Sequence, residues 1–392
     1  MRYRSGRHFL QIPGPTNVPD RILRAMDRPT IDHRSLQFSG LAEEIFERLK
    51  PVCGSTGPVL IFPGSGTGGW EAALVNTLSP GDEVLLCENG FFAAKVGKTA
   101  RKLGLRVRVL EGDWRRAVDP EAVERTLAQD AAHLIRALLV VHNETSTGAT
   151  TLIDSLRKAI DRARHPALLM VDSISSLGCV DYRHDEWGID VTIASSQKGL
   201  MLPPGICFNV PSEKALKVSG RSRLARSYWD WRPQLQANEK GFFPYTPATN
   251  LLFGLREALR LIDEEGLRNV YLRHQRLAEA TRRAVEGWGL KIFCAKPEER
   301  SVSVTAVQVP ESVNADEVRA LILDRYDLSL GAGLGKLAGK VFRIGHLGSF
   351  NALMLMAALS GIEMGMAVHG GLPFQPGGVL AAMQYLQSLE AS

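Results

Sequence analysis

The sequence lacks long apolar runs. None approaches the roughly 18 consecutive apolar residues that a membrane-spanning helix needs, so no transmembrane helix is expected. Residues 1–7 are basic, but no apolar segment follows them, so a signal peptide is not expected. Residues 390–392 do not form a peroxisomal address. These absences predict a cytoplasmic protein that makes no membrane contact.

Cysteine is also scarce. The chain has 5 cysteines, an odd number, and no Cys-x-x-Cys pair. This pattern excludes a disulfide framework and the common zinc-binding spacings. We therefore expect reduced thiols in the protein core and no metal site.

The charge imbalance is too small to predict a nucleic-acid partner. The net charge is +5, and the basic residues are scattered without interleaved aromatics. The exception is the segment 221–226 (RSRLAR), which we interpret as a basic loop that attracts small anionic substrates. The 392 residues, 45% of them hydrophobic, are enough for one large and one smaller domain.

Strand and helix signals alternate over the first half of the chain. Such alternation predicts an α/β fold with a mostly parallel, doubly wound sheet. Beyond residue 266 the pattern changes to that of a smaller α+β domain, with half-buried strands at 302–307 and 341–345. We predict an N-terminal arm over 1–19, a large domain over 20–265 and a small C-terminal domain over 266–392. The strands expected in the large domain cover residues 59–62, 83–88, 106–110, 137–141, 167–172, 190–194 and 206–210.

Two of these strands end at residues that suggest chemistry. Asp172 ends one buried strand, and Lys198 follows another within the segment 194–205 (ASSQKGLMLPPG). Most lysines are solvated surface groups, but open α/β sheets bind their ligands at strand ends. A lysine in a partly dry pocket loses its proton readily and can form a Schiff base. Pyridoxal phosphate enzymes combine such a lysine with a carboxylate and a phosphate cradle.

The phosphate cradle is predicted at residues 63–71 (PGSGTGGWE), between a strand and a helix. Glycines that open a helix leave backbone N–H groups free for a phosphate, and Ser65 and Thr67 add hydroxyl donors. The same glycines match G-x-G-x-x-G, and Glu88 ends the next strand, as in dinucleotide-binding folds. A nicotinamide-dependent dehydrogenase is therefore a rival interpretation, although it leaves Asp172 and Lys198 without a role.

Four further features are candidates for the same site. Gly14 lies in a proline-rich segment, residues 9–19, and would let the backbone approach a substrate. Residues 142–148 (HNETSTG) form a very polar loop behind a buried strand. Phe92 follows a strand and could stack on a flat heterocycle or pack in the core. Arg343 alternates with apolar neighbours, so it is either a solvated strand residue or a bidentate carboxylate clamp.

These residues together resemble a known family, the class V, fold-type I pyridoxal phosphate aminotransferases. The similarity is greatest to the serine–glyoxylate and alanine–glyoxylate aminotransferases, and it runs nearly end to end. In this order, the motifs that carry it are very specific as a set: residues 13–17 (PGPTN), 64–71 (GSGTGGWE), 142–145 (HNET), 171–173 (VDS), 196–198 (SQK), 244–247 (PYTP) and 339–345 (GKVFRIG).

The resemblance implies a role for each matching residue. Lys198 would form the Schiff base and act as general base, and Asp172 would pair with the pyridinium nitrogen. Arg343 would hold the substrate carboxylate. The remaining implied cofactor contacts are Ser65, Gly66, Thr67 and Gln197 at the phosphate, Thr145 at the ring hydroxyl, Phe92 on the ring, and Tyr245 and Thr246 reaching the phosphate from the second subunit of a homodimer.

The implied reaction is transamination of a small amino acid, serine favoured and alanine possible, with glyoxylate as acceptor, which yields glycine and a 2-oxo acid. Phe243 stands where alanine-preferring relatives carry Tyr. Ser146, Ser173 and Ser195 also depart from the family's usual small residues. The alternatives are another class V transaminase, directed to pyruvate, aspartate or a phosphonate, or a lyase; the dehydrogenase; and a non-enzymatic relative that keeps the fold.

Overall fold

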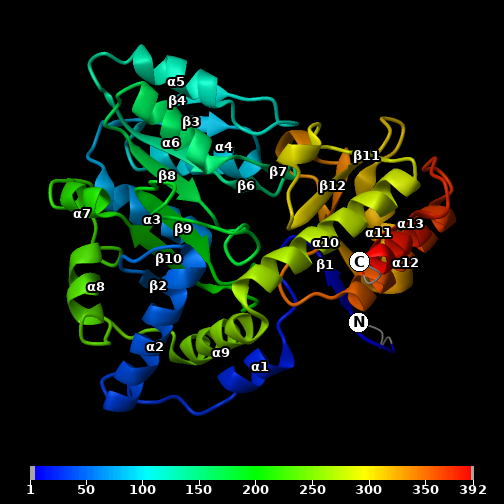
Figure 1. Cartoon of the computed structure of the whole chain (residues 1–392), viewed down its shortest axis with the longest axis horizontal. Helices are drawn as coiled ribbons and strands as arrows, with labels where there is room; N and C mark the ends of the chain where they lie inside the picture. Colours follow the sequence, from blue (N-terminus) through cyan, green and yellow to red (C-terminus); the bar gives the residue numbers. More distant parts are fainter. Residues whose placement is uncertain (1–4, 390–392) are drawn as a thin grey trace.

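The computed structural model describes residues 5–389. Residues 1–4 and 390–392, on which the signal-peptide and peroxisomal expectations depend in part, lie outside this range. The chain forms a large mixed sheet flanked by helices and a smaller sheet with its own helices, joined by the long helix α10 (Leu267–Gly287) (Figure 1).

The large sheet has seven strands, and its mostly parallel character is confirmed. Strands β9, β8, β5, β3 and β4 are parallel, whereas β10 is antiparallel to both of its neighbours, β2 and β9. In sheet order the strands are β2 (Leu60–Gly64), β10 (Gly205–Pro211), β9 (Val191–Ser195), β8 (Leu168–Asp172), β5 (Ile135–Val141), β3 (Glu83–Glu88) and β4 (Arg106–Glu111).

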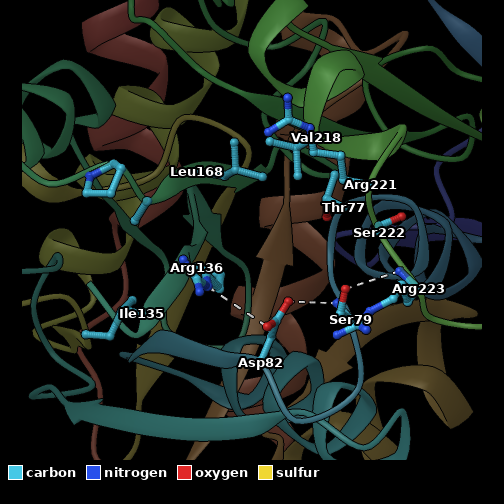
Figure 2. A pocket seen from close by; sticks show the side chains of 12 residues that line it. Thr77, Ser79, Asp82, Ile135, Arg136, Leu168, Val218, Arg221, Ser222 and Arg223 are labelled. Carbon is cyan, nitrogen blue, oxygen red and sulfur yellow. Dashed lines mark hydrogen bonds and ion pairs between the residues drawn. The ribbon is translucent and has the colours of Figure 1, made fainter. Parts of the chain in front are cut away.

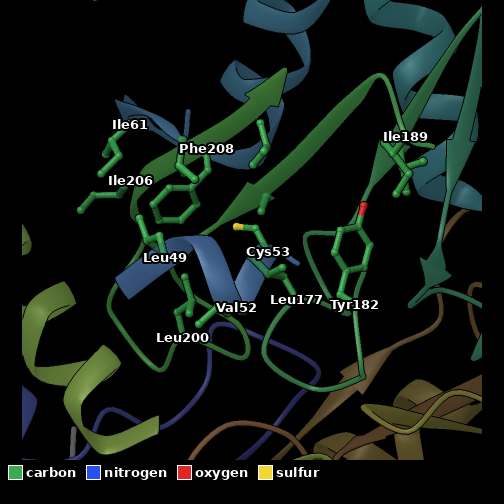
Figure 3. Packing of buried hydrophobic residues seen from close by; sticks show 14 of the residues in the cluster. Leu49, Val52, Cys53, Ile61, Leu177, Tyr182, Ile189, Leu200, Ile206 and Phe208 are labelled. Carbon is green, nitrogen blue, oxygen red and sulfur yellow. The ribbon is translucent and has the colours of Figure 1, made fainter. Parts of the chain in front are cut away.

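Helices cover both faces of this sheet because alternate strand residues point to opposite sides. Leu169 and Val171 of β8 belong to one core, whereas Leu168 and Met170 belong to another. The first core is closed by α2 (Leu36–Cys53), α5 (Pro120–Ala128), α6 (Ile153–Arg162) and α9 (Thr249–Glu265). The second is closed by α3 (Gly66–Thr77), α4 (Phe91–Lys102), α7 (Glu213–Ser219) and α8 (Trp231–Asn238). Figure 3 shows Leu49 and Val52 of α2 packed beside Ile206 and Phe208 of β10 in the first core.

Helix α3 begins at Gly66, within the glycine-rich segment 63–71 that the sequence analysis places between a strand and a helix. Glycine is a poor helix former, so the sequence does not predict a helix over these glycines. Tertiary packing overrides that preference here. A Cβ atom at Gly66 would clash with Ile174, and one at Gly69 would press on Ile193 of β9. The glycines therefore allow the first turn of α3 to lie directly against the sheet.

The small sheet combines both ends of the chain. Its order is β1 (Phe9–Gln11), β13 (Leu328–Ala332), β14 (Val341–Gly345), β12 (Val304–Gln308) and β11 (Lys291–Ile292). Strand β1 pairs in parallel with β13, which anchors the N-terminal segment beside the C-terminal half. Helices α11 (Ala315–Tyr326), α12 (Ala352–His369) and α13 (Gly378–Ser388) accompany this sheet.

Helix α12 corrects the expectation that no helix is long and apolar enough to cross a membrane. Its 18 residues have a mean hydropathy of 1.5, and 39% of them are buried. Polar residues such as Glu363 interrupt this helix, so the sequence does not show it as one continuous apolar run. Length and composition alone do not separate such a helix from a core helix. Leu355, Leu359 and Ile362 of α12 lie in the core of the small sheet.

Candidate active site

The site lies where three neighbouring strands of the large sheet end. Asp172 is the last residue of β8, Thr145 follows β5, and Lys198 follows β9. Parallel strands bring their carboxyl ends to one edge, where open α/β sheets bind ligands. These side chains surround a cavity of about 230 Å³. Its lining comprises Gly14, Pro15, Gly66, Thr67, Phe92, Val141, Asn143, Thr145, Asp172, Ile174, Ser175, Gln197 and Lys198.

The amine of Lys198 points into this cavity and contacts the N-terminal segment. Its Nζ donates a hydrogen bond to the Pro13 carbonyl at 2.5 Å. Gly14 has φ +121° and approaches so closely that a Cβ atom there would clash with the lysine side chain. Burial, followed by the positive charge of Arg343, lowers the pKa of Lys198 to about 8. The neutral, nucleophilic amine is therefore accessible near physiological pH.

Asp172 is held by two donors from its own chain. The indole Nε1 of Trp70 donates to Oδ2 at 2.8 Å, and the backbone N–H of Ile174 donates to Oδ1 at 2.9 Å. The residue is only 6% exposed, and burial raises its pKa to about 6 despite these two bonds. A cationic group placed beside it would pair with the carboxylate and favour its ionised form. Sequence reasoning missed the role of Trp70, because helix spacing alone does not show which strand end faces the indole.

The glycine-rich turn supplies the expected anion cradle at the start of α3. Ser65 is the N-cap residue, and its hydroxyl makes no capping hydrogen bond, so it remains available to a ligand. Gly66 and Thr67 line the cavity, and the first N–H groups of a helix have no intrahelical partner. Lys95 of α4 donates to the Thr67 hydroxyl at 3.2 Å and adds a positive charge that sequence reasoning missed.

Phe92 is positioned by a buried carboxylate, Glu144. Its Oε2 accepts the backbone N–H groups of Phe92 and Ala93 at 3.0 and 3.1 Å. Its Oε1 accepts hydrogen bonds from the backbone N–H and the hydroxyl of Ser146, at 3.0 and 2.7 Å. Glu144 thus joins the polar loop after β5 to the first turn of α4, although burial raises its pKa. The sequence marked this loop as polar but gave no partner for the carboxylate.

Arg343 is a buried residue next to the cavity rather than part of its lining. Its Nε donates to the Ala332 carbonyl at 2.7 Å and its Nη1 to the Thr145 carbonyl at 3.0 Å. Burial lowers its pKa to about 10, so it remains protonated at neutral pH. Nη2 makes no hydrogen bond within the described part of the chain. The protein thus occupies Nε and one N–H group of Nη1, which leaves Nη2 for a substrate carboxylate.

Three predicted cofactor contacts do not line the cavity within this chain. Ser65 lies just outside its lining, at the exposed start of α3. Tyr245 stacks on Tyr228 with ring centroids 4.3 Å apart, and its buried hydroxyl has no partner among the described residues. Thr246 is exposed. The predicted contribution of Tyr245 and Thr246 to a second subunit's phosphate site stays a prediction.

The basic segment 221–226 is not at this site, contrary to its interpretation as a substrate-attracting loop. Strand β10 is antiparallel to β9, so the chain leaves β10 at the opposite edge of the sheet. The segment follows α7 and contributes Arg221, Ser222 and Arg223 to a separate cavity, next to the starts of β5 and β8.

The dinucleotide interpretation also fails on strand order. In that fold, the strand before the glycine-rich turn lies beside the strand that ends in the acidic residue. Here β2 pairs with β10, whereas β3 pairs with β4 and β5. Glu88 lines a different cavity from that of Gly66 and Lys198.

Comparisons with known proteins agree with this geometry. Residues 8–341 match the family model described as Aminotransferase class-V. The chain is similar to the serine–glyoxylate aminotransferase of Methylorubrum extorquens, with 51% identity over 98% of this chain and 97% of that protein. It is 44% identical to the L-aspartate–glyoxylate aminotransferase of Paracoccus denitrificans, over 97% and 96% of the two chains. The crystal structure of pyridoxamine–pyruvate aminotransferase from Mesorhizobium loti superposes with a TM-score of 0.91 at 27% identity, covering 99% of this chain and all of that one.

Proposed function

This chain belongs to the class V, pyridoxal phosphate-dependent aminotransferases, and we propose that it transfers the amino group of serine to glyoxylate, with alanine as a possible second donor. The observation that carries the proposal is the convergence of Lys198, Asp172 and the first turn of α3 on one cavity. The relatives named for serine and glyoxylate support the choice of substrates. The products are glycine and a 2-oxo acid.

The residues of this cavity fit pyridoxal phosphate. The cofactor's phosphate would bind the free N–H groups of Gly66 and Thr67 and the uncommitted hydroxyl of Ser65. Gln197 lines the same cavity, and its side chain makes no hydrogen bond within the described residues, so its amide N–H groups can donate to the phosphate. When bound, pyridoxal phosphate supplies an electrophilic aldehyde and an electron sink for a substrate carbanion.

The protein groups then have separate tasks. The Lys198 amine, with its lowered pKa, removes the proton from the substrate α-carbon and returns one later in the reaction. The Asp172 carboxylate, oriented by Trp70, keeps a proton on the ring nitrogen by charge pairing. Arg343, held by the Thr145 carbonyl, would orient the substrate carboxylate through its uncommitted nitrogen, and the Thr145 side chain would contact the ring hydroxyl of a bound cofactor.

The lining of the cavity favours a donor with a small neutral side chain. Among the described residues that line it, Lys198 is the one basic side chain. Arg343 lies beside the cavity and is assigned to the α-carboxylate. A second carboxylate, as in aspartate, would be desolvated there without a cation of its own, which is costly. Serine instead brings a neutral hydroxyl, which needs no cation when it is buried.

The test has two parts. Borohydride reduction of one sample locates the lysine that carries the cofactor. Assays of a second, untreated sample compare serine, alanine and aspartate as donors with glyoxylate as acceptor. We expect a yellow protein, a borohydride label on Lys198, and kcat/KM for serine at least about tenfold above that for aspartate, equivalent to about 1.4 kcal/mol. A higher kcat/KM for aspartate would refute the serine assignment. A label on another lysine would refute the site. The Lys198→Arg variant keeps the charge and serves as the inactive control.

The proposal includes a cytoplasmic homodimer with shared sites. It is supported by the orphaned hydroxyl of Tyr245, by the exposed Thr246, and by cysteines that are all unpaired and buried. Light scattering measures the dimer, and cell fractionation measures the location. Mixing Lys198→Ala subunits with Thr246→Ala subunits tests the sharing. Each hybrid dimer would regain one intact site, so activity above that of either parent is expected, and its absence would contradict shared sites.

A further inference from the structure

A second cavity, of about 540 Å³, lies at the edge of the large sheet opposite the active site (Figure 2). It is bounded by the end of α3, the starts of β5 and β8, and the loop after α7. Because α3 has 12 residues, its rise of 1.5 Å per residue separates this cavity from the phosphate cradle by about 18 Å. The cavity is therefore not part of the catalytic site.

The lining of this cavity is divided between charge and apolar surface. Arg136 reaches it from the start of β5, and Arg221 and Arg223 reach it from the loop after α7. Asp82 is the one carboxylate in the lining. The apolar part of the lining consists of Ile135, Pro166, Ala167, Leu168 and Val218. Three guanidinium groups and one carboxylate leave a surplus of two positive charges.

The carbonyl groups at the end of α3 favour a nearby cation, and Arg226, which does not line the cavity, supplies it. Carbonyl groups at a helix end carry partial negative charge. Arg226, whose side chain is 7% exposed, donates to the carbonyls of Val75 and Ser219 at 3.0 Å each, and to the Ser222 hydroxyl at 2.6 Å. Arg226 thus binds one carbonyl near the end of α3 and one at the end of α7, and it fixes the loop after α7.

The arginines that line the cavity, in contrast, make few hydrogen bonds or ion pairs with the rest of the protein. Arg221 and Arg223 are exposed, and their side chains make no hydrogen bond or ion pair within residues 5–389. Arg136 is paired only loosely with Asp82, at 4.0 Å between Nε and Oδ1. The other oxygen of Asp82 accepts the backbone N–H of Ser79 at 2.7 Å. Ser79 accepts the N–H of Arg223 at 3.2 Å, so its own hydroxyl proton is free to bind a ligand (Figure 2).

We propose that this cavity binds a small phosphate monoester, with the phosphate between Arg136, Arg221 and Arg223 and the organic part on Ile135, Leu168 and Val218. A phosphate dianion would neutralise the two surplus charges, and guanidinium forks match its oxygens in geometry. The cavity is larger than inorganic phosphate needs, and its apolar wall gives a hydrocarbon group a surface to cover. The site is independent of the proposed reaction.

The probe is phenyl phosphate, titrated calorimetrically into the purified enzyme with its cofactor bound, so that the phosphate cradle of the active site is already filled. The test variant is Arg221→Gln/Arg223→Gln. The matched control is Arg268→Gln/Arg325→Gln, which removes the same charge from exposed positions outside this cavity. Transaminase turnover confirms that both variants are folded.

We expect saturable binding of phenyl phosphate to the unmodified enzyme and a Kd about tenfold higher in the Arg221/Arg223 variant, equivalent to about 1.4 kcal/mol. The control should stay within about twofold of the unmodified enzyme. Binding that is absent up to about 10 mM, equal in both variants, or abolished by saturating amino acid substrate would overturn the proposal. Inorganic phosphate should bind more weakly than phenyl phosphate. Equal affinities would show that the cavity binds the phosphate ion only, and would overturn the proposal that the organic group packs on the apolar wall.

Discussion

Replacing Trp70 with Phe removes one of the two protein donors to Asp172 and leaves the backbone N–H of Ile174 as the other. A hydrogen bond to a charged group contributes about 1.5–3 kcal/mol. Since 1.36 kcal/mol corresponds to one pKa unit, the pKa of Asp172 should rise by about 1–2 units. In the cofactor-free protein this change starts from a value of about 6.

The direction of the effect on turnover follows from the ionisation that the reaction requires. Asp172 must be a carboxylate to pair with the protonated ring nitrogen, so activity is lost as pH falls through its pKa. The positively charged ring lowers that pKa in both proteins, but the lost indole bond raises it in the variant. The acidic limb of kcat/KM should therefore move to higher pH by about 1–2 units in Trp70→Phe. Activity well above the limb should be affected less.

The assay is the pH profile of kcat/KM, together with the infrared carboxyl band of the cofactor-free protein. Trp288→Phe is the matched control, since the indole of Trp288 donates to Glu363 at 2.7 Å, outside the site. The control is expected to lower stability without moving the acidic limb. If the limb and the carboxyl band both stay in place in Trp70→Phe, the indole does not set the ionisation of Asp172.

Three further predictions concern the same site. Arg343→Lys should raise KM for both substrates at least about tenfold in steady-state assays, because an ammonium group cannot hold the Thr145 carbonyl and a carboxylate in one plane; an unchanged KM would contradict the clamp. Glu144→Gln should destabilise the protein by about 2 kcal/mol or more in thermal melts, because an amide presents N–H groups to backbone donors, whereas Glu311→Gln, at an exposed position, should change stability by less than about 0.5 kcal/mol. The rate at which pyridoxal phosphate recombines with the cofactor-free protein should rise as pH increases through about 8, since the neutral amine of Lys198 is the nucleophile; a rate that falls over this range in stopped-flow absorbance would contradict the lowered pKa.

The parts of the site that the sequence could predict are those attached directly to strand ends. Buried parallel strands are short, nearly continuous apolar runs, so their final polar residues are visible without a structure. Asp172 and Lys198 were found in this way, and the structure places both on one cavity. The glycine-rich turn was visible because few other functions require so many glycines between a strand and a helix.

The supporting groups were not predictable because they act across tertiary contacts. The indole of Trp70 reaches Asp172 from a position 102 residues earlier in the chain. Lys95 reaches Thr67 from the next helix, and Glu144 caps a helix that begins more than 50 residues before it. Helical or strand periodicity shows which face is buried, but not which neighbour it meets.

The direction of β10 is predictable from the length of the connection that precedes it. The apolar run at 206–210 reads the same in either direction, so composition does not reveal that β10 is antiparallel. The connection between β9 and β10 does reveal this direction. A parallel crossover requires a dozen or more residues, and residues 196–204 are too few. An antiparallel β10 returns the chain to the amino-terminal edge of the sheet, and segment 221–226 must then lie near the end of α3. The direction of this one strand thus separates the basic loop from Lys198 and leaves its arginines free for a different anion.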